Sequence, residues 1–175
     1  MKKNYEMDMC SGPILGKLLT FTIPLIFSGI LQLLFNAADV IVVGRFAGSQ
    51  SLAAVGSTTA LINLMINIFI GLSVGVNVIV ARYYGAKREK DVQDTIHTAM
   101  ALSIVSGLFL IILGQLLSRP MLELMGTPDD VIDKSTIYMR IIFIGMPANM
   151  IYNFGSAILR AVGDTKRPLY FLTAA

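Results

Sequence analysis

Four apolar segments separated by short polar connectors dominate this sequence. The first, residues 18–43, runs for 26 residues and carries a single charged side chain, Asp39. A helix of about 20 apolar residues can cross the hydrocarbon core of a bilayer, which is roughly 30 Å thick. Residues 51–81 contain no charged residue, and residues 95–118 contain no acid, lysine or arginine. The pattern predicts an all-α polytopic membrane protein.

The fourth apolar segment, residues 135–159, is free of charged residues from Ile141 onward. A fifth helix is expected to begin at about residue 168. We therefore expect a polar N-terminal arm over residues 1–17, followed by a transmembrane bundle over residues 18–175.

Two further features predict how these helices bend and pack. Pro24 lies within the first helix and Pro147 within the fourth. A proline inside a helix removes one backbone hydrogen bond and tends to kink the helix. Gly71 and Gly75 form a GxxxG pair, a spacing that permits close approach of two membrane helices.

The composition limits the classes of function. Charged residues make up 14% of the chain, against about 25% in an average soluble protein. The net charge of +3 comes from basic residues between apolar segments, so the expected partner is the lipid bilayer and not a nucleic acid. The sequence shows no nucleotide-binding loop, metal-ligand cluster or nucleophile–base pair, so we expect neither an enzyme nor a cofactor.

The distribution of basic residues predicts the orientation. Ten of the fourteen lysines and arginines lie in the N-terminal arm and in the second and fourth connectors. Cytoplasmic connectors of membrane proteins are enriched in these residues. We therefore expect a multi-pass plasma-membrane protein with a cytoplasmic N-terminus and with Asp39 toward the outside.

Asp39 is the principal candidate for a functional residue. An acid near the centre of a bilayer costs about 2.5–3.5 kcal/mol and usually faces a protein interior or a water-filled pathway. At about 100° per residue, Asp39 shares one face of its helix with Ser28, Gln32 and Asn36. This stripe predicts a cation or proton site. The alternative is that Asp39, separated from Arg45 by five residues, merely reaches interfacial water.

Amide side chains form similar stripes on two other predicted helices. The second helix carries Asn63, Asn67 and Asn77, and the fourth carries Asn149, Asn153 and Ser156. One such stripe alone is typical of hydrogen bonding between helices. Three stripes with a carboxylate among them favour an internal polar cavity. We expect its lining to include Ser28, Gln32, Asn36, Asn63 and Asn67.

Four patches of the chain resemble the N-terminal part of the multidrug and toxic compound extrusion (MATE) transporters. They are PLIFSGILQLLFNAADVIVVGRFAG (24–48), SLAAVG (51–56), GLSVGVNVIVARYYGAK (71–87) and LRAVGDTKRP (159–168). The resemblance covers essentially the whole chain. It implies a partial N-terminal six-helix bundle of a twelve-helix transporter with two pseudo-symmetric halves. The chain would then be a fragment, with the C-terminal bundle expected on the same full-length protein.

The resemblance also implies an activity. Members of this family are antiporters that export cationic or amphipathic drugs by alternating access, with sodium or a proton as the coupling ion and no cofactor. In that family an aspartate on the first helix and an asparagine on the fourth bind the coupling ion. The matching positions are Asp39, where a sodium ion would bind, and Asn153, with Asn149 one turn away as the fallback.

Two other functions stay open at this point. A lipid-linked oligosaccharide flippase of the same superfamily would have several basic residues in its cavity, whereas the first two predicted helices carry only Asp39 inside. A helical membrane scaffold without transport activity would not need Asp39 buried. Free access of an outside reagent to Asp39 would favour the scaffold.

The predicted orientation can be tested at Cys10, the only cysteine of the sequence. We expect an impermeant thiol reagent to label Cys10 only after the cells are permeabilised, because the N-terminal arm should lie in the cytoplasm. Labelling of Cys10 in intact cells would reverse the topology.

Overall fold

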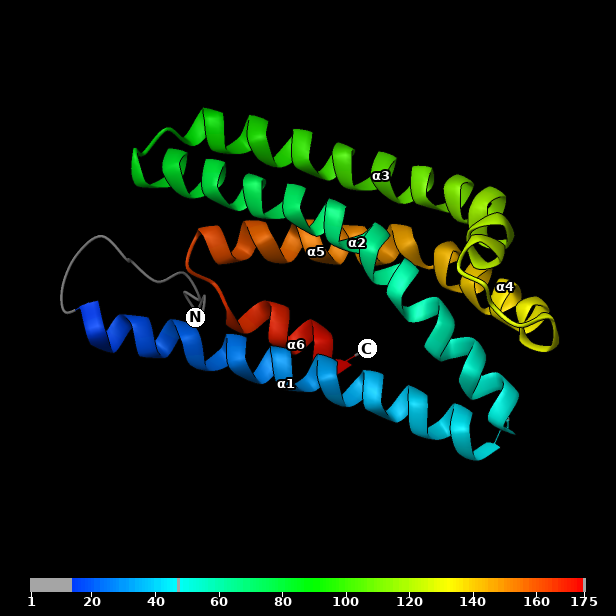
Figure 1. Cartoon of the computed structure of the whole chain (residues 1–175). Helices are drawn as coiled ribbons and strands as arrows, with labels where there is room; N and C mark the ends of the chain where they lie inside the picture. Colours follow the sequence, from blue (N-terminus) through cyan, green and yellow to red (C-terminus); the bar gives the residue numbers. More distant parts are fainter. Residues whose placement is uncertain (1–13, 47, 175) are drawn as a thin grey trace.

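The computed structural model describes residues 14–46 and 48–174, and its regular structure within these ranges is entirely helical. Cys10 and most of the predicted N-terminal arm lie outside the described residues. Figure 1 shows the helices lying along a common long direction. They are α1 (Ile14–Phe46), α2 (Gly48–Gly85), α3 (Glu89–Leu124), α4 (Asp129–Ile144), α5 (Met146–Ala161) and α6 (Lys166–Ala174).

The helices extend beyond the apolar segments that predicted them. α3 begins at Glu89, several residues before the apolar segment at 95, and carries Glu89 and Asp91 in its first turn. Acidic side chains at this end interact favourably with the helix dipole. The connector expected over residues 44–51 is also largely helical, since α1 ends at Phe46 and α2 begins at Gly48. The hydropathy pattern therefore marks the part of each helix that suits the membrane and not the ends of the helix.

The connections between helices lie at two opposite ends of the molecule (Figure 1). α1 joins α2 and α3 joins α4 at one end, whereas α2 joins α3 and α5 joins α6 at the other. Within the described residues, three helices are long and apolar enough to cross a membrane, and α4 with α5 would form a fourth span. The two connectors that are rich in basic residues thus share one end, as the sequence predicted.

The fourth apolar segment is broken into two helices. α4 and α5 meet at Gly145 and are bent by 47°. Pro147 has no N–H and its ring crowds the carbonyl of Phe143, which favours a kink or break at this point. The bend predicted at Pro147 is confirmed. Pro24 behaves differently, because α1 remains a single helix through it.

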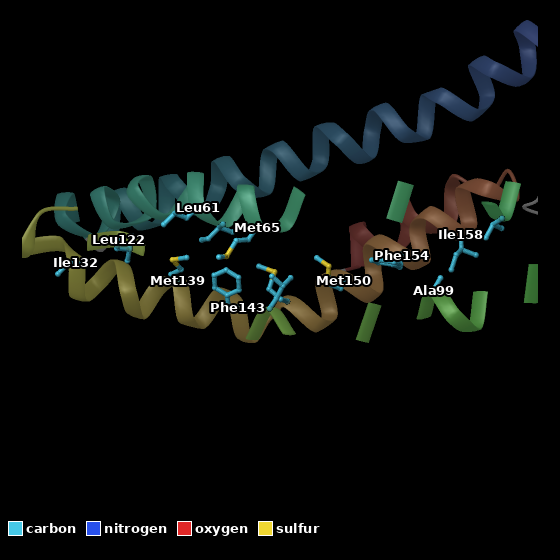
Figure 2. Packing of buried hydrophobic residues seen from close by; sticks show 14 residues of the cluster. Leu61, Met65, Ala99, Leu122, Ile132, Met139, Phe143, Met150, Phe154 and Ile158 are labelled. Carbon is cyan, nitrogen blue, oxygen red and sulfur yellow. The ribbon is translucent and has the colours of Figure 1, made fainter. Parts of the chain in front are cut away.

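The core lies between α2, α3 and the broken span. Figure 2 shows Met139, Phe143, Met150 and Phe154 following one another along α4 and α5, and all four side chains are fully buried. Lipid tails are as apolar as these side chains, so the association of membrane helices depends on close packing and on hydrogen bonds between them. Methionine suits such a core because its flexible side chain fills irregular gaps.

Two glycines of α3 lie in close contact with the broken span. A Cβ atom added to Gly107 would lie 2.5 Å from the Cα of Pro147, and one added to Gly114 would overlap the ring of Phe143. Gly71 and Gly75, the predicted contact pair, have no atom of a neighbouring helix within 4 Å of the corresponding position. This pair therefore makes no close helix contact among the described residues, and its role in packing stays a prediction. Close packing here uses two glycines seven residues apart, on the face of α3 that meets the broken span.

Hydrogen bonds also tie α2 to the broken span. The Asn77 amide donates to the carbonyl of Ala157 in α5 at 2.7 Å, and the hydroxyls of Ser57 and Ser135 lie 3.2 Å apart. α1 is held less extensively. None of its residues is buried among the described residues, and its backbone approaches only α2 and α6.

The start of α6 is set by a buried carboxylate. The Asp164 side chain is 1% exposed, and its Oδ1 accepts hydrogen bonds from the backbone N–H groups of Lys166 and Arg167, both at 3.1 Å. Its Oδ2 lies 3.1 Å from the Nε of Arg167, close enough for an ion pair. These N–H groups have no partner within the helix, so Asp164 caps its N-terminus.

We expect Asp164→Ala to lower the unfolding free energy of the complete protein by about 1–2 kcal/mol, because the cap is lost. Asp164→Asn is the matched control, since its amide oxygen can still accept the two backbone bonds. Thermal unfolding in detergent would compare the variants. If Asp164→Asn is as destabilising as Asp164→Ala, the ion pair with Arg167 matters more than the cap.

Candidate functional site

Asp39 is joined to the broken span by a hydrogen bond. The Tyr138 hydroxyl of α4 donates to Oδ2 of Asp39 in α1 at 3.0 Å. The two residues are 99 positions apart, and the backbones of α1 and α4 do not contact each other. Asp39 is exposed among the described residues. This side-chain bond therefore links α1, which has no buried residue among those described, directly to a helix of the packed core.

Tyr138 is the residue that sequence reasoning missed. It lies between the acidic start of α4 and the break at Gly145, in the half of the span nearer the connection between α1 and α2. Asp39 lies in the corresponding half of α1. The sequence places Tyr138 at a depth in its span similar to that of Asp39, the only acid of α1. This becomes a signal only when α1 and α4 are known to face each other.

The other polar residues predicted on the first helix have different surroundings. Ser28 donates to the carbonyl of Pro24, one turn earlier in the same helix, at 2.9 Å. Gln32 and Asn36 are exposed. The face shared by these residues thus stands open in the described part of the chain, with Asp39 at its end. Their role as cavity lining stays a prediction.

Asn149 and Asn153 form a pair with each other. Nδ2 of Asn153 donates to Oδ1 of Asn149 at 2.7 Å and to its backbone carbonyl at 2.9 Å. Both residues lie on α5, beyond the break, whereas Tyr138 lies on α4. Within the described residues, no hydrogen bond joins Asp39 to either asparagine. The predicted grouping of Asp39 with Asn153 or Asn149 therefore stays a prediction.

The amides of α2 divide between two faces. Asn63 and Asn67 are exposed, and Nδ2 of Asn67 donates to the carbonyl of Asn63 at 2.7 Å. By helical geometry these two lie opposite the buried face of α2, which includes Leu61 and Met65. Asn77 points to α5, as described above. The stripe predicted on this helix thus contains one asparagine that holds helices together and two that face away from the core.

A pocket of about 310 Å³ lies beside the Asp39–Tyr138 bond. It opens between the ends of α1, α2 and α4, and most of its lining is aliphatic. Tyr138 contributes to this lining as well as to the bond with Asp39, so the pocket and the carboxylate share one side chain. The lining residues are Val43, Ser51, Ala54, Val55, Lys134, Ile137, Tyr138 and Ile141.

The chemistry available here is that of the Asp39 carboxylate with its Tyr138 hydroxyl donor, and Lys134 adds an ammonium group to the lining of the pocket. No group of three His, Cys, Asp or Glu side chains that could hold a metal ion occurs in the described parts of the chain. A carboxylate with one hydroxyl donor can take up a proton, or it can supply one oxygen ligand to an alkali cation, which prefers oxygen ligands. Either event would compete with or reorient the bond to Tyr138.

Comparison with known proteins identifies relatives over nearly the whole chain. The MatE family model matches residues 24–175. The probable multidrug resistance protein YoeA of Bacillus subtilis (strain 168) is 35% identical over 152 residues, which are 87% of this chain and 33% of that protein. The FAD transporter of Shewanella oneidensis is 27% identical over 168 residues, or 95% of this chain and 37% of that protein.

The fold is also similar to solved structures. The crystal structure of MATE in complex with MaD3S superposes with a TM-score of 0.83 at 27% identity, over 90% of this chain and 35% of that one. The expected fold class, part of the helical bundle of such a transporter, is therefore confirmed. The chain spans about a third of the length of these relatives.

The hydrogen bond between Tyr138 and Asp39 should be measurable as a coupling energy. We expect a double-mutant cycle of Tyr138→Phe and Asp39→Ala, followed by unfolding of the complete protein, to give about 1 kcal/mol. The control cycle pairs Tyr138→Phe with Asn36→Ala, which lies one turn away on α1, and should give additive effects. Equal coupling in the two cycles would contradict a specific bond.

Proposed function

This chain belongs to the MatE family of membrane transporters, and from that premise we propose that the complete protein exports cationic or amphipathic compounds across the plasma membrane in exchange for sodium ions or protons. The observation that carries the proposal is the bond between the Tyr138 hydroxyl and the Asp39 carboxylate. It places an acid of an apolar span, α1, against a polar group of another span.

The exchange would depend on competition for one carboxylate. When Asp39 is ionised and free of a cation, it accepts the hydrogen bond of Tyr138. When a proton or a sodium ion binds the carboxylate, its oxygen no longer accepts the Tyr138 hydrogen bond in the same way. The link between α1 and α4 is then weaker. Because α1 is otherwise held only by α2 and α6 among the described residues, its position would respond to the state of Asp39. Alternating access requires such a difference between two states.

Cationic or amphipathic cargo is favoured by the charges along the candidate site. Asp39 is the only charged residue of α1 between Lys17 and Arg45, and the apolar part of α2 carries none. The aliphatic pocket beside Tyr138 would suit the apolar part of such a molecule. Membership of a transporter family also favours this function over a membrane scaffold, even though Asp39 is exposed among the described residues.

A second candidate cargo is a flavin dinucleotide, which is anionic. One relative is an FAD transporter, and Arg160 is half-buried on the same face of α5 as Asn149 and Asn153. A guanidinium binds phosphate groups with two parallel hydrogen bonds. Efflux of both ethidium and FAD from loaded vesicles would separate the two cargo classes.

We expect Asp39→Asn in the complete protein to abolish ion-coupled efflux and to leave membrane insertion intact. The amide keeps the size and hydrogen-bonding shape of the carboxylate but removes the charge that attracts a cation or proton. Because a neutral amide costs less to place in the membrane, the amount of protein should hold or increase. The measurement is ethidium efflux from vesicles under imposed sodium and proton gradients, at matched protein levels.

Asn36→Ala, on the same face of α1, is the matched control and should reduce efflux much less, because an amide can only orient the site. Efflux by Asp39→Asn at the parental rate would show that the carboxylate does not couple ion and cargo. The polar face of α1 would then serve helix packing.

A further inference from the structure

The Asp39–Tyr138 bond depends on the direction in which α4 leaves the break at Gly145. We propose that Gly114 of α3 is a positioning residue for this bond. By accommodating the ring of Phe143, it sets the direction of α4 and brings the Tyr138 hydroxyl within reach of Asp39. The transport part of this inference rests on the proposed function, whereas the geometric part stands without it.

Gly114 leaves the space that the side chain of Phe143 occupies, and we call this space the seat of Phe143. Phe143 is fully buried, and it lies where the side chain of any larger residue at position 114 would have to be. The hydroxyl of Ser118, one turn later, bonds the Gly114 carbonyl, so this serine turns its polar group back onto α3. The ring can therefore lie directly against the α3 backbone only because residue 114 has no side chain.

A second glycine repeats this contact on the other side of the break. Gly107, two turns before Gly114, lies under Pro147 at the start of α5. Phe143 and Pro147 are four residues apart and flank Gly145. Through the two glycines, α3 contacts both halves of the broken span, once on each side of the break.

These two contacts matter because the helical series of backbone hydrogen bonds is interrupted at the break. Three backbone bonds lie at this junction: Gly145 N–H to the Ile142 carbonyl at 3.0 Å, a cap N–H to the Phe143 carbonyl, and Asn149 N–H to the Gly145 carbonyl at 3.3 Å. Pro147 has no N–H to donate. Where a proline interrupts the ladder of helical bonds, side-chain packing decides the bend angle. The contact of Phe143 with α3 is therefore one of the constraints on the direction of α4, beside its packing against α2.

A small change in the bend would break the bond to Asp39. Tyr138 lies seven residues before Gly145, a distance of about 10 Å along a helix. A tilt of about 10° about the break would move it by roughly 2 Å, whereas a hydroxyl bond to oxygen needs a separation of about 2.5–3.0 Å. Both halves of the span are anchored to α2, α5 through Asn77 and α4 through Ser135, so a displaced Phe143 would change the angle between the two halves.

The geometric test uses spin labels at Arg45→Cys on α1 and Ile137→Cys on α4, in a cysteine-free background of the complete protein. Both side chains are exposed. We expect Gly114→Ala to shift the distance between the labels by about 2 Å, in line with the tilt estimated from the helix rise. Gly155→Ala is the matched control, because no neighbouring atom lies within 4 Å of its added Cβ, and it should leave the distance unchanged.

Two further variants guard against misfolding as an explanation. Phe143→Leu empties the seat without adding volume and should broaden the distribution of distances. Gly114→Ala combined with Phe143→Leu adds volume on one side and removes it on the other, and should restore the parental distance. An unchanged distance in both single variants would overturn the proposal.

The functional test asks whether Gly114 acts through Tyr138. We expect Gly114→Ala and Tyr138→Phe each to lower the half-saturating concentration of the driving ion about tenfold, because the lost hydrogen bond stabilised the ion-free carboxylate and competed with the ion. The maximal efflux rate should change little, and the two effects should not add. Additive effects, or a loss confined to the maximal rate, would contradict positioning. If the parental protein exports nothing, the proposed function fails and the label distances still test the seat.

Discussion

Hydrocarbon offers no partner for a hydrogen bond, and this constraint acts on the polar residues within the apolar spans that the structure describes. Most hydroxyls satisfy it within their own helix. Ser28, Ser103 and Thr136 each donate to a backbone carbonyl three or four residues earlier. Such residues tolerate the membrane but join no helices. Polar groups that cross between helices are therefore the informative ones, and Asp39 with Tyr138 is the pair that contains an acid from within an apolar segment.

The same constraint explains why the two halves of the broken span, α4 and α5, make different polar contacts. α5 is fixed by the Asn77 amide and by buried methionine and phenylalanine side chains, and it carries the asparagine pair. α4 carries Tyr138 and meets α1 through a single hydrogen bond. The break at Gly145 lets these two halves point in different directions. Two polar features of one apolar segment thus come to face different neighbours.

Much of this architecture could be predicted from the sequence. Apolar length identified the spans, Pro147 identified the break, and the clustering of lysines and arginines identified which connectors share an end. These features depend on residues close together in the chain, through helix geometry and the free energy of burying charge. The helix ends were less accurate, because Glu89 and its neighbours continue a helix outside any apolar segment. The GxxxG pair could not be assigned a contact from the sequence, because close approach depends on which helix lies opposite; among the described residues, no atom of a neighbouring helix lies within 4 Å of a Cβ added at Gly71 or Gly75.

The sequence by itself determined that Asp39 is the one acid of an apolar span and that amides share faces with it or with one another, since helical periodicity is a local property. It could not determine the partner of Asp39. Asn153 and Tyr138 lie on the same apolar segment, and only a 47° bend separates the directions in which their helices run. That bend is held by Phe143 and Pro147 against two glycines of another helix. Contacts between residues so far apart in the chain arise only when the helices pack, so the tertiary structure alone decided that the hydroxyl of Tyr138 meets the carboxylate.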